Sequence, residues 1–202
     1  MIDTVIFDLG GVLIDWDPRH LYRKIIDDED RMEYFLTNIT TPDWNEQQDA
    51  GRPVAEAMEV LVSKHPVWER EIRAFYGRWE EMLAGPIHGT LDILANFRNA
   101  GEKRLLALTN WSAETFPIAK NRYEFLQWFE GILVSGEEGL KKPDPKFYRL
   151  LFERYEVIPE LAVFIDDSAR NIAAAQKCGL NTIHFQSPET LRDELRRHSL
   201  TA

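Results

Sequence analysis

Five short apolar runs constrain the fold of this chain more than any other feature. They are too short for helices and do not alternate with polar residues, which is typical of strands buried on both faces. Amphipathic stretches typical of helices precede the second run and separate the runs that follow it. Because strands that alternate with helices pair in parallel through right-handed crossovers, the sequence predicts an α/β fold, a Rossmann-like doubly wound parallel sheet. The runs lie at 4–7, 104–108, 132–134, 162–165 and 182–185, and the amphipathic stretches at 90–100, 113–129, 145–155 and 169–178.

One long segment interrupts this alternation. Residues 15–85 contain no strand pattern, only helical periods, and they hold four of the six tryptophans. We interpret these aromatic residues as the core of a helical insertion that ends at Gly85-Pro86, a natural point of return to the sheet. The sequence therefore predicts a catalytic core at 1–14 and 86–202 with an inserted helical cap at 15–85.

Composition and charge exclude several classes of protein. The chain has 24 basic and 34 acidic side chains, a net charge of −10, which argues against binding to nucleic acid. It has no apolar run long enough to span a membrane and no signal-peptide pattern. A single cysteine, Cys178, suits a reducing compartment. We therefore expect a cytoplasmic protein that does not bind membranes, and nothing in the sequence predicts its oligomeric state.

Polar residues follow the predicted strands at the edge where ligands bind in such a sheet. Singly, each has an ordinary role as a turn residue, a helix cap or a surface charge. Two adjacent carboxylates after a buried strand are different, because they repel unless a cation or hydrogen-bond donors compensate them. The residues are Asp8, Gly10, Gly11, Thr109, Asn110, Lys142, Asp166 and Asp167.

Together these groups favour phosphoryl transfer. A carboxylate can attack a phosphoryl group, Mg²⁺ is suited to carboxylate oxygens, and hydroxyl, amide and ammonium groups can bind the phosphoryl oxygens. Glycines beside the carboxylate at Asp8 let the backbone approach a ligand closely.

With these residues the chain resembles the haloacid dehalogenase (HAD) superfamily of hydrolases. Four motif positions occur in order, VIFDLGGVL, LLALTN, KKPDPKFY and VFIDDSARN, and they span residues 5–171. Their spacing is that of members with a helical cap between the first and second motifs. DLGGVLIDWD and TNWS resemble a branch of HAD-like phosphatases that includes bacterial α-glucose-1-phosphate phosphatases.

The resemblance implies a Mg²⁺-dependent phosphatase that acts on a small phosphorylated metabolite, with a sugar phosphate as one candidate, through an aspartyl-phosphate on Asp8. Its implied phosphoryl-binding residues are Thr109 and Lys142, supported by Asn110. The implied metal ligands are Asp8, the Gly10 carbonyl, Asp167 and, through a water, Asp166, while Asn171 is expected to orient Lys142.

The chain departs from the family at Gly10, where most phosphatases of the superfamily carry a second Asp as general acid and base. The resembling glucose-1-phosphate branch lacks this Asp too. Three explanations stay open: another acid reaches the site, the leaving group needs no acid, or hydrolysis is slow. The acidic candidates in or near the cap are Asp15, Asp17, Glu46 and Asp49.

Two other functions compete. A 2-haloacid dehalogenase would use Asp8 in a metal-free ester mechanism, but Asp166 and Asp167 would then lack a compensating cation. A catalytically weak protein that binds a phosphorylated ligand is favoured only by Gly10.

The polar stretch 41–52 has no clear periodicity. We hypothesise that it faces the site, the alternative being a polar loop between two cap helices. Its specificity candidates are Trp44, Asn45, Asp49 and Arg52, and Trp111 and Ser112 are expected to line the pocket from the core.

Overall fold

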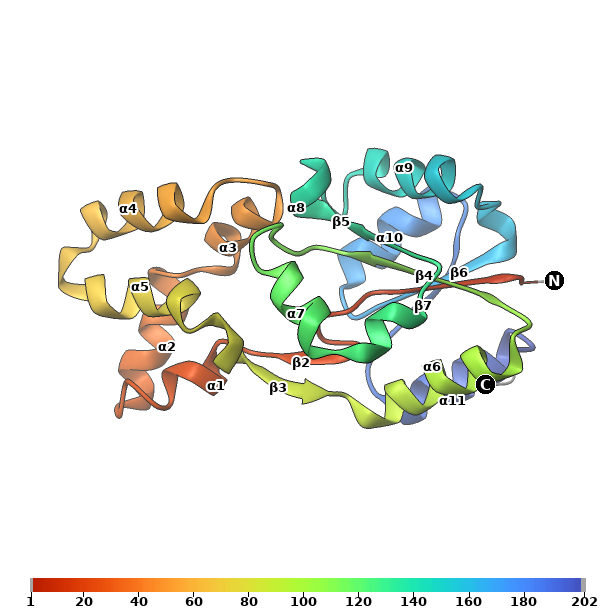
Figure 1. The fold of residues 1–202 in the computed structure, drawn as a ribbon, viewed down its shortest axis with the longest axis horizontal. Coiled ribbons are helices and arrows are strands. Elements are labelled where there is room, and N and C mark those ends of the chain that lie inside the picture. Colours follow the sequence, from red (N-terminus) through yellow and green to blue (C-terminus); the bar gives the residue numbers. More distant parts are fainter. Residues whose placement is uncertain (1, 201–202) are drawn as a thin grey trace.

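The computed structural model describes residues 2–200. A five-stranded parallel sheet with the order β5-β4-β1-β6-β7 forms its centre (Figure 1). The predicted doubly wound α/β sheet is therefore confirmed, and each predicted strand lies within one residue of an observed one. The strands are β1 (Thr4–Phe7), β4 (Arg104–Thr109), β5 (Gly131–Val134), β6 (Ala162–Asp166) and β7 (Asn181–His184).

Helices cover both faces of the sheet because alternate strand residues point to opposite sides. Val5 and Phe7 belong to the cluster on one face, and Ile6 belongs to the cluster on the other. The first face packs against α6 (His88–Ala100), α7 (Phe116–Arg122) and α11 (Pro188–Arg197). The second packs against α9 (Pro145–Tyr155) and α10 (Ala169–Lys177). The short elements of this part are α8 (Ser135–Glu138), η3 (Glu124–Trp128) and η4 (Pro159–Leu161).

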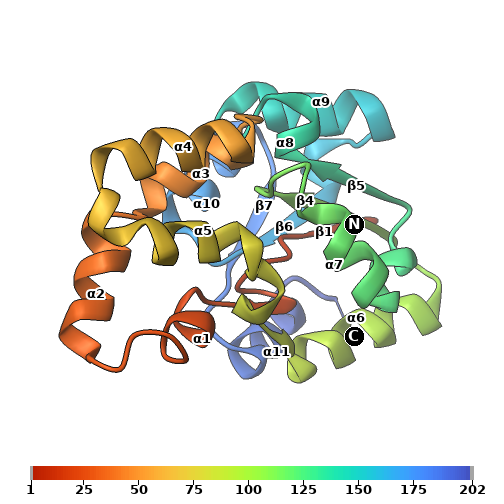
Figure 2. The same ribbon diagram turned by 60° about the vertical axis from the view of Figure 1, so that its left-hand side comes forward.

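A helical cap is inserted after the first strand, and we call residues 17–82 the cap segment. Figures 1 and 2 show it beyond the end of the sheet at which β1 finishes. Its long helices arise from the periods seen in the sequence. Trp44 and Trp79 are buried in its core as expected, while Trp68 packs against the cluster from a partly buried position. The elements are α1 (Arg19–Tyr22), α2 (Glu29–Asn38), α3 (Pro42–Asp49), α4 (Val54–Lys64), η1 (Pro66–Trp68), α5 (Glu69–Gly77) and η2 (Trp79–Met82).

Two further strands join the cap segment to the sheet, and the expectation that 15–85 contains no strand is wrong at both ends. β2 (Ile14–Trp16) and β3 (Leu83–Pro86) form an antiparallel two-stranded ribbon. Neither strand is long enough to show a hydrophobic period in the sequence. Their pairing arises from the return of the chain and not from a local pattern.

The polar stretch at 41–52 is mostly helical, which corrects the alternative of a loop. Thr41 accepts a hydrogen bond from the Trp44 backbone N–H at 3.1 Å, and Pro42 takes the first helical position of α3. A helix with so few apolar residues presents no clear hydrophobic period, which is why its sequence did not reveal it.

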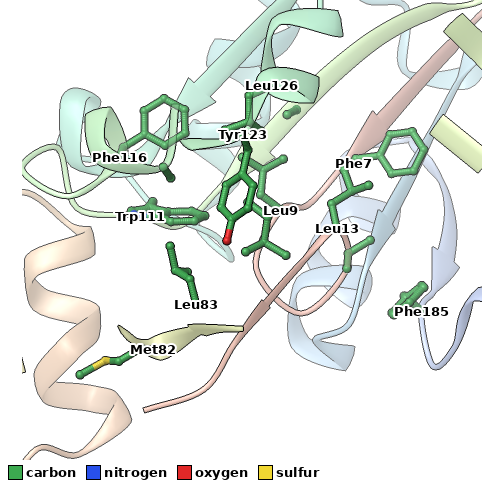
Figure 3. Packing of buried hydrophobic residues seen from close by; sticks show 14 of the residues in the cluster. Phe7, Leu9, Leu13, Met82, Leu83, Trp111, Phe116, Tyr123, Leu126 and Phe185 are labelled. Atoms are coloured by element: carbon green, nitrogen blue, oxygen red, sulfur yellow. The ribbon is translucent and has the colours of Figure 1, made fainter. Parts of the chain in front are cut away.

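One hydrophobic cluster runs from the sheet into the cap segment. Trp79 of η2 and Trp111 after β4 lie edge to face with ring centroids 5.5 Å apart. Figure 3 shows Leu83 next to Trp111, with Met82 beyond Leu83 in the same cluster. Within residues 2–200, no helix combines the length and apolar character needed to cross a membrane.

Candidate active site

Three neighbouring strands end at one edge of the sheet and bring the predicted residues together. Asp8 follows β1, Thr109 ends β4, and Asp166 ends β6. A tight turn follows Asp8, because the backbone N–H groups of Leu13 and Ile14 both donate to the Leu9 carbonyl, at 2.8 and 2.9 Å. The turn keeps Asp8 at the carboxyl end of the central strand.

A buried lysine bridges two of the carboxylates. Lys142 Nζ lies 2.8 Å from Asp8 Oδ1 and 2.7 Å from Asp166 Oδ2. Lys142 and Asp166 have no exposed surface, and Asp8 is 8 % exposed. Because Asp8 Oδ1 also accepts from the Leu9 backbone N–H at 2.8 Å, its carboxylate is held in one orientation.

Two asparagines hold this arrangement in place. Asn110 accepts from the Lys142 backbone N–H at 2.8 Å and donates to the Lys142 carbonyl at 3.0 Å, so it fixes the loop that carries the ammonium group. Asn171 was expected to orient Lys142, but it donates instead to Asp166, at 3.1 and 3.2 Å. Its effect on Lys142 is therefore indirect, because Asp166 is the residue that meets the ammonium group.

Burial and charge shift the pKa values of the bridged groups. Desolvation raises the pKa of Asp8 well above its usual range, and Asp166 adds to this, although Lys142 opposes it. Burial works against the charge of Lys142, but Asp166 and Asp8 outweigh it and raise its pKa. Lys142 is therefore held as a cation between the two carboxyl groups.

The carboxylates could hold a divalent cation. Asp8, Asp166 and Asp167 each offer an oxygen, and these oxygens lie within 4.8 Å of one another. Three carboxylates face one ammonium group, so their negative charge exceeds what Lys142 neutralises. Carboxylate oxygens in this number suit Mg²⁺. The residues present therefore fit the metal that the sequence predicted.

Gly11 allows Asp167 to take its place in this cluster. Its φ is +74°, and a Cβ there would lie 2.3 Å from Asp167 Oδ2. Any other residue would meet both a strained backbone and the carboxylate. Gly11 therefore has a positioning role for Asp167.

Thr109 adds an unpartnered hydroxyl at the same edge. The residue is 1 % exposed, and its Oγ1 has no hydrogen-bond partner among residues 2–200. A buried hydroxyl without a partner costs free energy, which a bound phosphoryl oxygen would recover.

A cavity of about 650 Å³ opens between the site and the cap segment. It is walled by core residues, by the turn after β2, and by α2, α3 and α5. A second cavity of about 60 Å³ adjoins it, and its wall includes four aromatic side chains, Trp16, Tyr76, Trp79 and Trp111. The residues that line the larger cavity include Asp8, Gly10, Gly11, Asp15, Asp17, Thr40, Asn45, Glu46, Asp49, Asn110 and Asp167.

The specificity candidates separate into two groups. Asn45 lines both cavities, and Trp111 and Ser112 line the smaller one. Trp44 and Arg52 line neither. Trp44 is 7 % exposed and packs edge to face on Phe75 at 5.1 Å.

The neighbours of Arg52 explain its distance from the cavities. Its guanidinium group pairs with Glu56 at 3.1 Å and donates to Gln47 at 3.0 Å. Both partners belong to the cap segment, so Arg52 links α3 to α4.

The four acidic candidates all line the larger cavity, but their neighbours differ. Asp15 lies 3.1 Å from His20, and Asp17 lies 3.4 Å from Arg19. Glu46 forms ion pairs with Lys141 and Arg170 and so links α3 to the core. Asp49 has no ion pair with any described residue.

The sequence did not identify three residues of the cavity walls. Trp16 and Tyr76 line the cavities, and Thr40 has a buried hydroxyl that no described residue meets. Trp16 lies in β2 and Tyr76 in α5. Trp16 lies within the quoted stretch DLGGVLIDWD, but no local pattern predicts that Thr40 and Tyr76 reach the site, because packing of the cap segment on the sheet brings them there.

Comparisons with known proteins show which family and which fold this chain is similar to. The family model described as haloacid dehalogenase-like hydrolase matches residues 2–179. A sesquiterpene phosphatase of Aspergillus oryzae is 26 % identical over 194 residues, which cover 96 % of this chain and 95 % of that protein. A phosphorylated carbohydrates phosphatase of Thermotoga maritima is 27 % identical over 190 residues, covering 91 % of this chain and 84 % of that one.

A solved structure shares the fold. The magnesium complex of a HAD family enzyme from Bacteroides thetaiotaomicron superposes with a TM-score of 0.75 at 21 % identity. The match covers 96 % of this chain and 98 % of that one. The similarity therefore extends through both the sheet and the cap segment.

Proposed function

Because the chain belongs to the haloacid dehalogenase-like hydrolases, we propose that it is a Mg²⁺-dependent phosphatase that works through an aspartyl-phosphate on Asp8. The observation that carries the proposal is the cluster of three carboxylates, two of them bridged by the buried ammonium group of Lys142. A carboxylate nucleophile, a divalent cation and a fixed ammonium group are the parts that phosphoryl transfer to a protein side chain requires.

The chemistry follows from the position of each group. A carboxylate oxygen of Asp8 attacks phosphorus, the bond from phosphorus to the ester oxygen breaks, and an aspartyl-phosphate forms. Water then attacks the same phosphorus and releases inorganic phosphate. Lys142 and Thr109 bind the phosphoryl oxygens, where negative charge spreads in the transition state.

The proposed metal ligands are Asp8, the Gly10 carbonyl and Asp167, with Asp166 acting through a water. When bound, Mg²⁺ would supply positive charge that screens the anionic nucleophile from the anionic substrate. Asp166 also fixes Lys142, because it is fully buried and accepts from its ammonium group at 2.7 Å.

The substrate class that the cavity supports is a small phosphorylated metabolite. A volume of about 650 Å³ lies in the range of small-molecule sites. The polar wall contributed by Asp15, Asp17, Thr40 and Asn45 suits hydroxyl groups. The name of the Thermotoga maritima relative, a phosphorylated carbohydrates phosphatase, supports a sugar phosphate.

Hydrolysis of 4-nitrophenyl phosphate, with Mg²⁺ and with EDTA, tests the proposal. We expect Mg²⁺-dependent turnover in the wild type and its loss in Asp8→Asn, which is nearly isosteric. The matched control is Asp43→Asn, because Asp43 is an exposed acid on α3 that lines neither cavity. Circular dichroism should show that both variants fold.

Full turnover in EDTA would contradict the role of the metal. Undiminished turnover in Asp8→Asn would contradict the role of the nucleophile. If no phosphate ester is hydrolysed, chloride release from 2-chloropropionate would indicate the competing dehalogenase reaction instead.

A further inference from the structure

Gly10 provides no acid for the leaving group, so the structure must supply one from elsewhere or do without it. We propose that Asp49, the last residue of α3, is the general acid and base of this site, an inference that rests on the phosphatase function proposed above. Five observations carry it: the place of Asp49 between the cavities, the neighbours of the competing acids, the orientation of its carboxyl group, its fixed backbone, and its burial beside Glu46.

Asp49 stands where the two cavities meet. It is one of the residues that line both of them, together with Gly10 and Asn110, which follow the ends of β1 and β4. The space at Gly10 is open, since a Cβ built there would meet no heavy atom within 4 Å. A substrate whose phosphoryl group lies at Asp8 therefore has room for its ester oxygen between Gly10 and Asp49.

The other three acids are less suited to donate a proton. Glu46 is neutralised by two cations, Lys141 and Arg170, and its pKa is lowered. Arg19 forms ion pairs with both Asp17 and Glu33. Asp15 is half exposed and lies beside His20. Because its pKa is lowered, Glu46 stays ionised at neutral pH and has no proton to give.

The Asp49 carboxyl group is oriented by an amide and not by a cation. Asn45 Nδ2 donates to Asp49 Oδ2 at 3.1 Å, and the Tyr76 hydroxyl donates to Asn45 Oδ1 at 2.9 Å. Asn45 is thus fixed from both ends. No side chain among residues 2–200 donates to Oδ1 of Asp49, and the further donor near this carboxyl group is the Ser112 backbone N–H.

The backbone of Asp49 is anchored to the core. Its carbonyl accepts from the Ser135 hydroxyl, and the same hydroxyl accepts from the Trp111 backbone N–H at 2.9 Å. Ser135 begins α8, and Trp111 lies in the loop after β4. The cap residue is therefore held against the strand end that carries Thr109.

The burial of Asp49 and the charges around it favour its protonated form near neutral pH. Burial and the neighbouring Glu46 raise its pKa to about 7, against opposing effects from Lys141, the Ser112 backbone N–H and Lys142. The negative end of the α3 dipole acts in the same direction as Glu46. Tyr76, the titratable group that faces Asp49 from α5, has its own pKa raised and stays neutral.

A pKa close to the working pH is the optimum for a group that first gives and then takes a proton. The Asp49 carboxyl transfers its proton to the ester oxygen as the bond to phosphorus breaks, and an alcohol leaves. The resulting carboxylate takes a proton from the water that attacks the aspartyl-phosphate. Phosphate leaves, and the Asp49 carboxyl and the Asp8 carboxylate are both restored.

Leaving groups of different basicity test the role. Phenyl phosphate and 4-nitrophenyl phosphate have nearly the same shape, but the phenol needs a proton to leave and the nitrophenol does not. We expect Asp49→Asn to lower kcat/KM for phenyl phosphate by roughly 10²-fold or more. The fold-loss for 4-nitrophenyl phosphate should be at least about ten times smaller. Asp43→Asn, on the same helix, should change neither value.

The pH profile gives a readout that a merely structural role would not move. Because the acid must be protonated, wild-type kcat/KM for phenyl phosphate should fall as pH rises through about 7. This decrease of kcat/KM at alkaline pH should be absent in Asp49→Asn. It should move to lower pH in Glu46→Gln, because Glu46 raises the Asp49 pKa.

Three results would overturn the proposal. The first is an equal loss of kcat/KM for both esters in Asp49→Asn, and the second is no loss for either ester. The third is a decrease of kcat/KM at alkaline pH that persists unchanged in that variant. Turnover of 4-nitrophenyl phosphate that depends on Asp8 would leave the phosphatase function standing in each case. If the wild type shows no such turnover of either ester, the phosphatase function fails and the role of Asp49 fails with it.

Discussion

At the scale of single residues, Lys142 sets the charge balance of the site. It is fully buried, and its ammonium group is shared by Asp8 and Asp166. Removing one partner of a buried ion pair costs more than the pair contributes, because a charge is left without compensation. Without Lys142 two buried carboxylates would face each other.

We therefore expect Lys142→Met to lower the free energy of unfolding by about 3–5 kcal/mol at pH 8 in EDTA. The loss should be smaller at pH 5.5. The folded-state pKa of Asp8 is already raised, so the folded protein takes up a proton there as pH falls, and stability is lost as pH rises through that pKa. Urea unfolding at the two pH values measures the difference.

Lys141→Met is the matched control for this variant. The ammonium group of Lys141 pairs with Glu46 at a partly exposed position. The expected loss in the free energy of unfolding is therefore below about 1 kcal/mol and depends little on pH. A loss of equal size at both pH values in Lys142→Met would mean that packing of the lysine stem, and not its charge, dominates.

At the scale of elements, what the sequence predicted divides by how local its signal is. The strands of the sheet were predicted because burial on both faces leaves uninterrupted apolar runs. β2 and β3 were missed because each is short and finds its partner only after the whole cap segment. The strand-end residues were predicted for the same topological reason, since parallel strands place their carboxyl ends together.

The contribution of the cap segment to the site was harder to predict from the sequence. The sequence named four acids without ranking them, because the ranking depends on which cations meet each one. Glu46 is neutralised by Lys141 and Arg170, which come from distant parts of the chain. Asp49 forms no ion pair with any residue between 2 and 200, and only the packed structure shows this.

α3 depends on its capping residue, because its own sequence is polar. Thr41→Ala removes the hydrogen bond to the Trp44 backbone N–H and should lower the free energy of unfolding by about 1 kcal/mol. For a chain of this size that corresponds to a Tm lower by about 2–4 °C. Thr37→Ala, an exposed position inside α2, is the control and should change stability by less than about 0.5 kcal/mol. Equal effects at the two positions would contradict the capping role.

At the scale of the whole molecule, the sheet and the cap segment share one hydrophobic cluster. The division at residues 14/15 and 85/86 stays a prediction about domain boundaries. The shared cluster indicates that the two parts unfold together, because neither can lose its packing without exposing apolar surface of the other. Trp79 and Trp111 lie at this junction.

We therefore expect one unfolding transition, with far-ultraviolet circular dichroism and tryptophan fluorescence giving the same midpoint. Trp79→Ala should lower stability by about 3–5 kcal/mol, because a buried ring is deleted from the shared cluster. It should shift both signals together. Val67→Ala, at a position 84 % exposed on the cap segment, should leave the midpoint nearly unchanged. Two separated transitions in the Trp79 variant would show that the cap segment and the sheet are independently stable, and that their common cluster does not couple them.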